Sequence, residues 1–152
     1  MEVFRLARKK FKIELSGKGA SLTGARWNSK GTEIVYCAQS RALAMAEVVV
    51  HLSLAVVPKD FVMLTITIPE IIIVAELDTN LLQRDWNIFP NSFTTQIIGD
   101  DFIRTGNNCI MKVPSAVVKG DFNFLLNPHH ADFSRIKITS QEDFPFDKRI
   151  FK

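Results

Sequence analysis

The sequence predicts a single α+β domain that spans residues 1–152. Runs of β-branched and aromatic residues outnumber the helical stretches and do not alternate with them regularly, which argues against a Rossmann-type parallel sheet. With 152 residues, of which 47% are hydrophobic, the chain is long enough for one core but not for two. No Gly/Ser/Pro-rich linker and no internal repeat divides it.

The first half of the chain is predicted to contain two short strands and one long helix. Strands are expected at 3–6 and 34–37, where apolar and β-branched residues cluster. Between them, residues 8–30 mix basic and small side chains without a helical or strand period, which predicts a long loop. Ser40 is a suitable N-cap for a helix of Ala, Leu, Met and Val that should reach about Leu54.

The second half is predicted to be richer in strands. Residues 61–68 are β-branched and end at Pro69, and residues 71–74 follow at once as an adjacent strand. Ser92, or the asparagine before it, should cap a helix that ends at Gly106. Three further strands are expected, at 109–113, 122–126 and 136–138.

The basic residues are concentrated near the N-terminus. The net charge is only +3, but residues 1–30 carry eight Lys or Arg against two acidic residues, whereas residues 31–80 carry two against six. A basic segment of this kind suits an anionic ligand or a nucleic acid. Direct binding of nucleic acid is disfavoured, because the segment lacks interleaved aromatic residues and no RNA- or DNA-binding motif is present.

Several classes of protein and of site are disfavoured by the sequence. No secretory signal is recognisable, so a cytoplasmic location is expected, and the most apolar stretch, 42–57, is too short and too interrupted to span a membrane. Cys37 and Cys109 lack the spacing of a zinc site or a disulfide framework, and we expect them to be reduced and buried. The three histidines give no convincing cluster, so no metal is expected.

Glu47 is the residue that most needs a chemical explanation. It lies in the apolar run 42–50, which leaves no polar helix face for it to occupy. A carboxylate in such a place must be paired, hydrogen-bonded or directed into a cavity, because burying it alone is costly. Two interpretations remain open: a catalytic carboxylate, or a helix-surface glutamate that bonds His51 one turn later.

Four other side chains are candidates for a site, each with a simpler structural role as its alternative. Arg26 could bind phosphate with its planar guanidinium, or be a solvated loop residue beside a buried Trp27. Tyr36 is the only tyrosine beside 12 phenylalanines, although a core tyrosine bonded to a carbonyl is common. Ser115 and Asn127 could supply polar contacts, or could only stabilise turns next to Pro114 and Pro128.

These residues lie in segments that resemble the RES domain family, named for its arginine, glutamate and serine. The resemblance runs in order along nearly the whole chain, through Phe4-Arg5-Leu6, Gly24-Ala25-Arg26-Trp27-Asn28, Ile34-Val35-Tyr36, Glu47 with His51, Thr95-Gln96-Ile97-Ile98-Gly99-Asp100, Val113-Pro114-Ser115 and Asn123-Phe124-Leu125-Leu126-Asn127-Pro128. Many dispersed matches in one order are more specific than any single motif. The family pattern falls on Arg26, Tyr36, Glu47 and Ser115.

The resemblance implies the toxin of a bacterial type II toxin–antitoxin pair, with an ADP-ribosyltransferase-like split β core, flanking helices and NAD⁺ as a substrate rather than a cofactor. It implies cleavage of the nicotinamide–ribose bond by a glycohydrolase or phosphorylase. Glu47 would stabilise the charge that develops on the ribose, and Arg26 would bind the pyrophosphate. The further NAD⁺ contacts expected are Tyr36 and Ser115 near the nicotinamide riboside, Trp27 stacked on a base, and Asn127.

Three alternatives stay open at this point. ADP-ribose could be transferred to a protein instead of water or phosphate. The chain could bind or cleave RNA, or it could be a non-enzymatic interaction domain. The resemblance also implies a helix-turn-helix antitoxin as partner, and the many phenylalanines of the last third leave room for a homodimer within the complex.

Overall fold

The protein is built on one seven-stranded mixed sheet, in a computed structural model that describes residues 1–151. The strands in chain order are β1 (Glu2–Arg8), β2 (Val35–Ala38), β3 (Phe61–Thr67), β4 (Val74–Glu76), β5 (Ile110–Pro114), β6 (Phe122–Leu126) and β7 (Lys137–Asp143). Their spatial order is β4-β5-β6-β2-β1-β3-β7, with β4 and β5 parallel and the other neighbours antiparallel. The predicted α+β class is confirmed.

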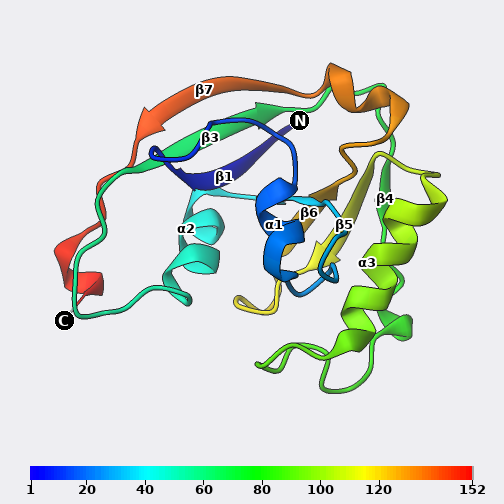
Figure 1. Ribbon diagram of the computed structural model, residues 1–152, viewed down its shortest axis with the longest axis horizontal. Coiled ribbons are helices and arrows are strands. Elements are labelled where there is room, and N and C mark those ends of the chain that lie inside the picture. The colour runs from blue at the N-terminus through cyan, green and yellow to red at the C-terminus, as the bar shows by residue number, and fades with distance from the viewer. Residues whose placement is uncertain (152) are drawn as a thin grey trace.

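The sheet is nearly divided between β1 and β2. Strand β1 pairs with β3 along its whole length, from Glu2 to Arg8, but it pairs with β2 only where Phe4 meets Ala38. The group β1, β3 and β7 therefore diverges from the group β2, β6, β5 and β4, as Figure 1 shows. This divide is the split core that the sequence resemblance implies.

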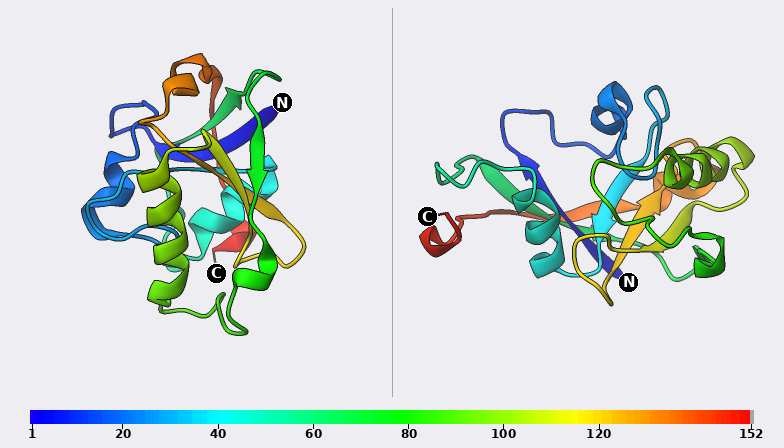
Figure 2. Two further views of the ribbon diagram at one scale, coloured as in Figure 1. Left: turned by 90° about the vertical axis from the view of Figure 1, so that its right-hand side faces the viewer. Right: turned by 90° about the horizontal axis from the view of Figure 1, so that it is seen from below.

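Three α-helices flank the sheet: α1 (Lys18–Thr23), α2 (Arg41–Val49) and α3 (Phe93–Thr105). Helix α2 packs against β1 and β2 at the divide, and α3 lies beside the other half of the sheet (Figure 2). The predicted caps are confirmed, since Ser40 accepts a hydrogen bond from the Leu43 N–H and Ser92 accepts one from the Thr94 N–H. Gly106, at φ +62°, ends α3 in the left-handed conformation.

The structure corrects three expected elements. The segment 8–30 is not all loop, because α1 lies within it; this helix buries none of its residues, so no apolar period marks it. Helix α2 ends at Val49 instead of reaching Leu54. The chain after it forms tight turns, and Leu52 and Val57 of this segment pack on the core. The expected strand at 71–74 begins at Val74, and it pairs with β5 rather than β3.

The core consists of three apolar clusters, and one of them fastens α3 to the sheet. Phe102 of α3 packs with Trp27, Ile34, Met111, Val113 and Leu125. Cys37 and Cys109 are buried and free, which confirms the expectation for both thiols. Because α2 packs across the divide and α3 packs on the half that contains β5 and β6, side chains from both halves face the space at the divide.

Candidate active site

A cleft of about 850 Å³ opens where the two halves of the sheet diverge. Its walls come from β1, β2, α2, the loop 23–27, the loop 87–91 and the connection between β5 and β6. Four of the residues singled out in the sequence line this cleft: Arg26, Trp27, Tyr36 and Glu47. The fold therefore brings together residues from three separate segments: the loop 23–27, β2 and α2.

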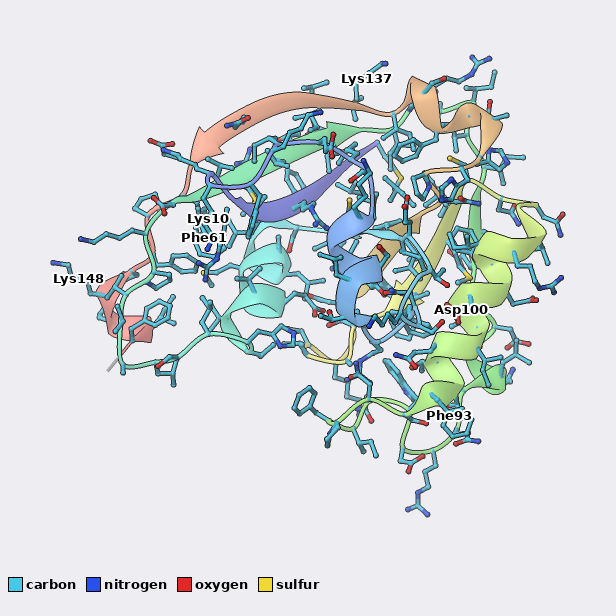
Figure 3. The ribbon with its side chains drawn as sticks, in the orientation of Figure 1. Lys10, Phe61, Phe93, Asp100, Lys137 and Lys148 are labelled. Atoms are coloured by element: carbon cyan, nitrogen blue, oxygen red, sulfur yellow. The ribbon has the colours of Figure 1, made fainter. Side chains whose placement is uncertain are left out.

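Helix α3 holds the loop that carries Arg26. The Thr95 hydroxyl donates to the Arg26 carbonyl at 2.6 Å, and the Gln96 amide donates to the Ala25 carbonyl at 2.9 Å. Asp100 accepts from the Ser29 N–H and from the Ser29 hydroxyl. Figure 3 labels Asp100 on the side of α3 that faces this loop. These bonds explain the polar residues of the segment 95–100: they fix the backbone on both sides of Arg26.

Gly99 permits this close approach. A Cβ at position 99 would lie 1.6 Å from the Trp27 carbonyl oxygen, so only a glycine lets α3 rest directly on the loop backbone. The same loop begins at Gly24, whose φ of +75° is a backbone conformation that residues with a side chain rarely adopt.

The Arg26 guanidinium is partly engaged inside the protein. It donates from Nη1 to the Trp86 carbonyl at 2.8 Å and from Nη2 to the Ile88 carbonyl at 3.1 Å, so it joins its own loop to the segment 86–88. Burial lowers the pKa of Arg26, and the nearby charge of Glu47 opposes that shift. The side chain keeps its charge and still has N–H groups free for a ligand.

The Tyr36 hydroxyl belongs to a buried hydrogen-bond network. It donates to Asn28 Oδ1 at 2.6 Å and accepts from the Trp27 N–H at 3.1 Å. Asn28 is 0% exposed, and its amide donates to three carbonyls, those of Ala20, Ser29 and Thr32. Burial raises the pKa of Tyr36 well above its ordinary value. Tyr36 therefore stays neutral and presents its ring to the cleft, while its hydroxyl fixes the Arg26 loop.

Glu47 is bonded to two side chains, and His51 is neither of them. Its Oε1 accepts from the Ser115 hydroxyl at 2.7 Å and from the Asn123 amide at 2.6 Å. Of the two interpretations of Glu47, the helix-surface pair with His51 is wrong. Both donors come from the β5–β6 hairpin, so Glu47 links α2 to that part of the sheet.

Ser115 is not placed as a nucleophile. It is 5% exposed, and its Oγ accepts from the N–H groups of Val117 and Val118 while it donates to Glu47. With its proton and its lone pairs occupied, the hydroxyl has no capacity left for a ligand. Its place is behind Glu47 rather than in the cleft wall.

Trp27 and Asn127 have structural surroundings. Trp27 is 2% exposed and packs near Trp86 with ring centroids 6.0 Å apart, so little of its ring is open to stack on a base. Asn127 is buried away from the cleft, and its Oδ1 accepts from the His129 N–H in a turn. The turn interpretation of Asn127 therefore fits the structure.

The cleft also contains residues that the sequence did not single out. Arg5 lines it and donates from Nη1 to the Tyr36 carbonyl at 2.8 Å. Arg5 could have been found from the sequence, because it is a single cation within the apolar run of residues 3–6. Phe89 is 76% exposed and lies edge-on to His51 at 6.5 Å across the mouth of the cleft. Phe89 could not be found from the sequence, because an exposed loop has no hydrophobic periodicity that would distinguish one of its residues.

Residues 1–151 include neither a candidate metal-binding cluster nor a candidate membrane-spanning helix. Within that range no three His, Cys, Asp or Glu side chains are grouped so as to hold a metal ion. None of the helices there has the length and apolar character needed to cross a membrane.

Known proteins resemble this chain along nearly its whole length. The RES domain family model matches residues 2–147. A protein named Toxin Res from Photorhabdus laumondii subsp. laumondii is 38% identical over 154 residues, which cover 100% of this chain and 98% of that protein. A protein named Prs ADP-ribosylating toxin from Sphingobium sp. (strain YBL2) is 36% identical over 141 residues, covering 91% and 88%.

A solved structure with a similar fold is described as the M. tuberculosis MbcT–MbcA toxin–antitoxin complex. The TM-score is 0.75 at 19% identity, and the match covers 95% of this chain and 84% of that one. The likeness supports the fold alone, and it confirms the ADP-ribosyltransferase-like architecture that the sequence resemblance implies. From the match over residues 2–147 and the two relatives above 30% identity, this chain belongs to the RES domain family, the family of the Res toxins.

Proposed function

We propose that this chain is the toxin of a toxin–antitoxin pair and that it consumes NAD⁺ by breaking the bond between nicotinamide and ribose. The observation that carries the proposal is the joint presence of one carboxylate, Glu47, and two guanidinium groups, Arg5 and Arg26, in a single cleft. A cleft of about 850 Å³ is within the size range of cofactor-binding sites. The charges suit a ligand with a diphosphate and ribose hydroxyls.

Arg26 would bind the pyrophosphate. Its two bonds to the carbonyls of Trp86 and Ile88 leave three of its five N–H groups for phosphate oxygens. The same bonds hold the guanidinium in one orientation, so less freedom is lost when a ligand binds. Arg5 would add positive charge from the floor of the cleft on β1.

Glu47 would stabilise the reacting ribose. When the bond from C1′ to the pyridinium nitrogen breaks, the electron pair goes to nicotinamide, which leaves neutral and needs no acid to protonate it. Positive charge develops on the ribose, and a fixed carboxylate stabilises that charge. Water then attacks C1′ and releases a proton, or phosphate attacks instead. One carboxylate is sufficient for this reaction, which fits a cleft in which, among residues 1–151, Glu47 is the only acidic side chain.

The direct test is release of nicotinamide from NAD⁺ by the purified chain, followed by chromatography. Glu47→Gln keeps an oxygen that accepts from Ser115 and Asn123 but removes the charge, so we expect turnover to fall by about 100-fold or more. Glu70→Gln is the matched control, because Glu70 is exposed and lies outside the cleft. Wild-type turnover in Glu47→Gln would refute the role of Glu47.

Transfer of ADP-ribose to a protein is the second candidate reaction. It is favoured by the name of the Sphingobium relative, a Prs ADP-ribosylating toxin at 36% identity. The cleft has an open mouth beside the exposed loop 87–91, where an acceptor side chain could enter. NAD⁺ labelled in its adenine separates the reactions: the label stays in small molecules after hydrolysis or phosphorolysis, and appears on protein after transfer.

We also propose an antitoxin as the partner, with a helix-turn-helix part for DNA and a segment that covers the cleft. Support comes from the structural neighbour, which was solved in a toxin–antitoxin complex, and from the exposed apolar side chains of Ile88, Phe89 and Phe93 beside the cleft. Expression of the chain should stop growth, and co-expression of the small protein encoded next to it should restore growth.

A further inference from the structure

We propose that Asn123 is a positioning residue for Glu47: together with Ser115 it holds Oε1, so that Oε2 alone is presented to the ligand. The proposal rests on the proposed NAD⁺ cleavage and deepens it. Asn123 lies on β6, opposite Ala38 of β2 and Val113 of β5, and its side chain lines the cleft. Its amide nitrogen lies 2.6 Å from Glu47 Oε1.

The direction of both hydrogen bonds is determined by their surroundings. The Ser115 oxygen already accepts from two backbone N–H groups, so its single proton must point to Glu47. The Asn123 side chain must turn its NH₂ group toward the carboxylate, because its carbonyl oxygen would be repelled there. Two donors therefore converge on one carboxylate oxygen.

The second oxygen of Glu47 is left for the ligand. Among residues 1–151 no hydrogen-bond donor reaches Oε2, and no buried side-chain oxygen or nitrogen in that range lacks a partner, so Oε2 is open to solvent. Because Glu47 lines the cleft, that opening faces the proposed ribose position. With Oε1 fixed from two directions, the carboxylate cannot rotate away as charge develops.

Two substitutions of the same size separate positioning from folding. Asn123→Leu keeps the branched shape, with a larger apolar end and no donor. We expect about 10- to 100-fold lower kcat with KM changed by less than about 3-fold, because the lost bond orients a reacting group and binds no substrate. Asn107→Leu is the matched control, since Asn107 is exposed and outside the cleft. A loss confined to KM, or no loss, would overturn the proposal.

The pH dependence of kcat is a further test, because a purely structural role of Asn123 would leave it unchanged. In Asn123→Asp a second carboxyl faces Glu47, and like charges so close share a proton, so the acid limb of kcat should move up by about one pH unit or more. The other ionisable groups that line the cleft are Arg5, Arg26, Tyr36, Cys37 and His51. Because His51 also lines the cleft, the double variant Asn123→Asp with His51→Gln is the control, and it should keep the shift. An unmoved acid limb would count against positioning.

A third measurement is independent of turnover. In the ligand-free protein, one ¹H resonance of the Asn123 side-chain amide should lie downfield and exchange slowly, and it should return to ordinary values in Glu47→Ala. If the wild-type chain releases no nicotinamide, the proposed function fails, while these resonances still decide whether Asn123 holds Glu47. Amide protons that do not respond to Glu47→Ala would refute the pairing itself.

Discussion

Replacing Gly99 by alanine tests whether α3 must lie directly on the Arg26 loop. The alanine Cβ would be 1.6 Å from the Trp27 carbonyl oxygen, and contacts below 3.0 Å are not tolerated, so helix and loop have to separate by about 1.4 Å. Such a movement breaks or weakens the bonds from Thr95, Gln96 and Asp100 to the loop.

The expected size of the effect follows from those four bonds. Two are neutral and contribute about 1 kcal/mol each, and the two to the Asp100 carboxylate contribute somewhat more. Alanine offsets about 1 kcal/mol of the loss through its better helix propensity. Because some of these bonds are weakened and not broken, we expect Gly99→Ala to lower the free energy of unfolding by about 2–4 kcal/mol, measured by urea denaturation.

The control is a second helical glycine. Gly19 lies in α1 with no atom within 4 Å of its would-be Cβ, so Gly19→Ala should leave stability unchanged or raise it by up to about 1 kcal/mol. Helix propensity alone predicts stabilisation for both variants. If Gly99→Ala also stabilises the protein, the packing of α3 on the loop is not what holds Arg26.

Three further predictions test the cleft and its supports. In Arg26→Lys the ammonium group cannot replace the two guanidinium bonds to the carbonyls of Trp86 and Ile88. The segment 82–91 is then held less firmly, so limited proteolysis should cut it faster than in the wild type. Tyr36→Phe leaves a buried Asn28 oxygen without its donor, and should lower the free energy of unfolding in urea by about 1–3 kcal/mol. Burial raises the pKa of the Cys37 thiol to about 12, whereas the thiol of the unfolded chain begins to ionise near pH 9. The contribution of the neutral thiol to stability is therefore complete below about pH 9, and the free energy of unfolding in urea should fall by up to about 1.4 kcal/mol per pH unit from there toward pH 12. Cys37→Ala should lack that part of the slope.

The placement of Ser115 changes how the three family residues act together. Arg26 and Glu47 face the cleft, whereas the Ser115 hydroxyl bonds Glu47 and the backbone N–H groups of Val117 and Val118. In the proposed reaction Ser115 is therefore a positioning residue, rather than the ribose contact expected from the resemblance. Asn123 has the same geometry from the neighbouring strand, so the carboxylate is held from two directions.

The parts of the fold that sequence could predict are those determined by local physics. The strand at 61–68, the Ser40 and Ser92 caps and the glycine that ends α3 follow from side chains within a few residues of one another. Helix α1 could not be predicted in this way, because it is six residues long and is tied down by Asn28 and Gly31 instead of by a buried face.

From the sequence alone it follows that Glu47 is a carboxylate in an apolar helix and needs a partner. The sequence offered His51, four residues away, while the tertiary structure supplied Ser115 and Asn123, which are 68 and 76 residues away. The carbonyls that hold Arg26 lie 60 and 62 residues away, and a carbonyl is present at every residue, so it leaves no trace in the sequence. Only the pairing of distant strands decides which of many polar groups meet, because that pairing depends on the whole core and not on neighbouring residues.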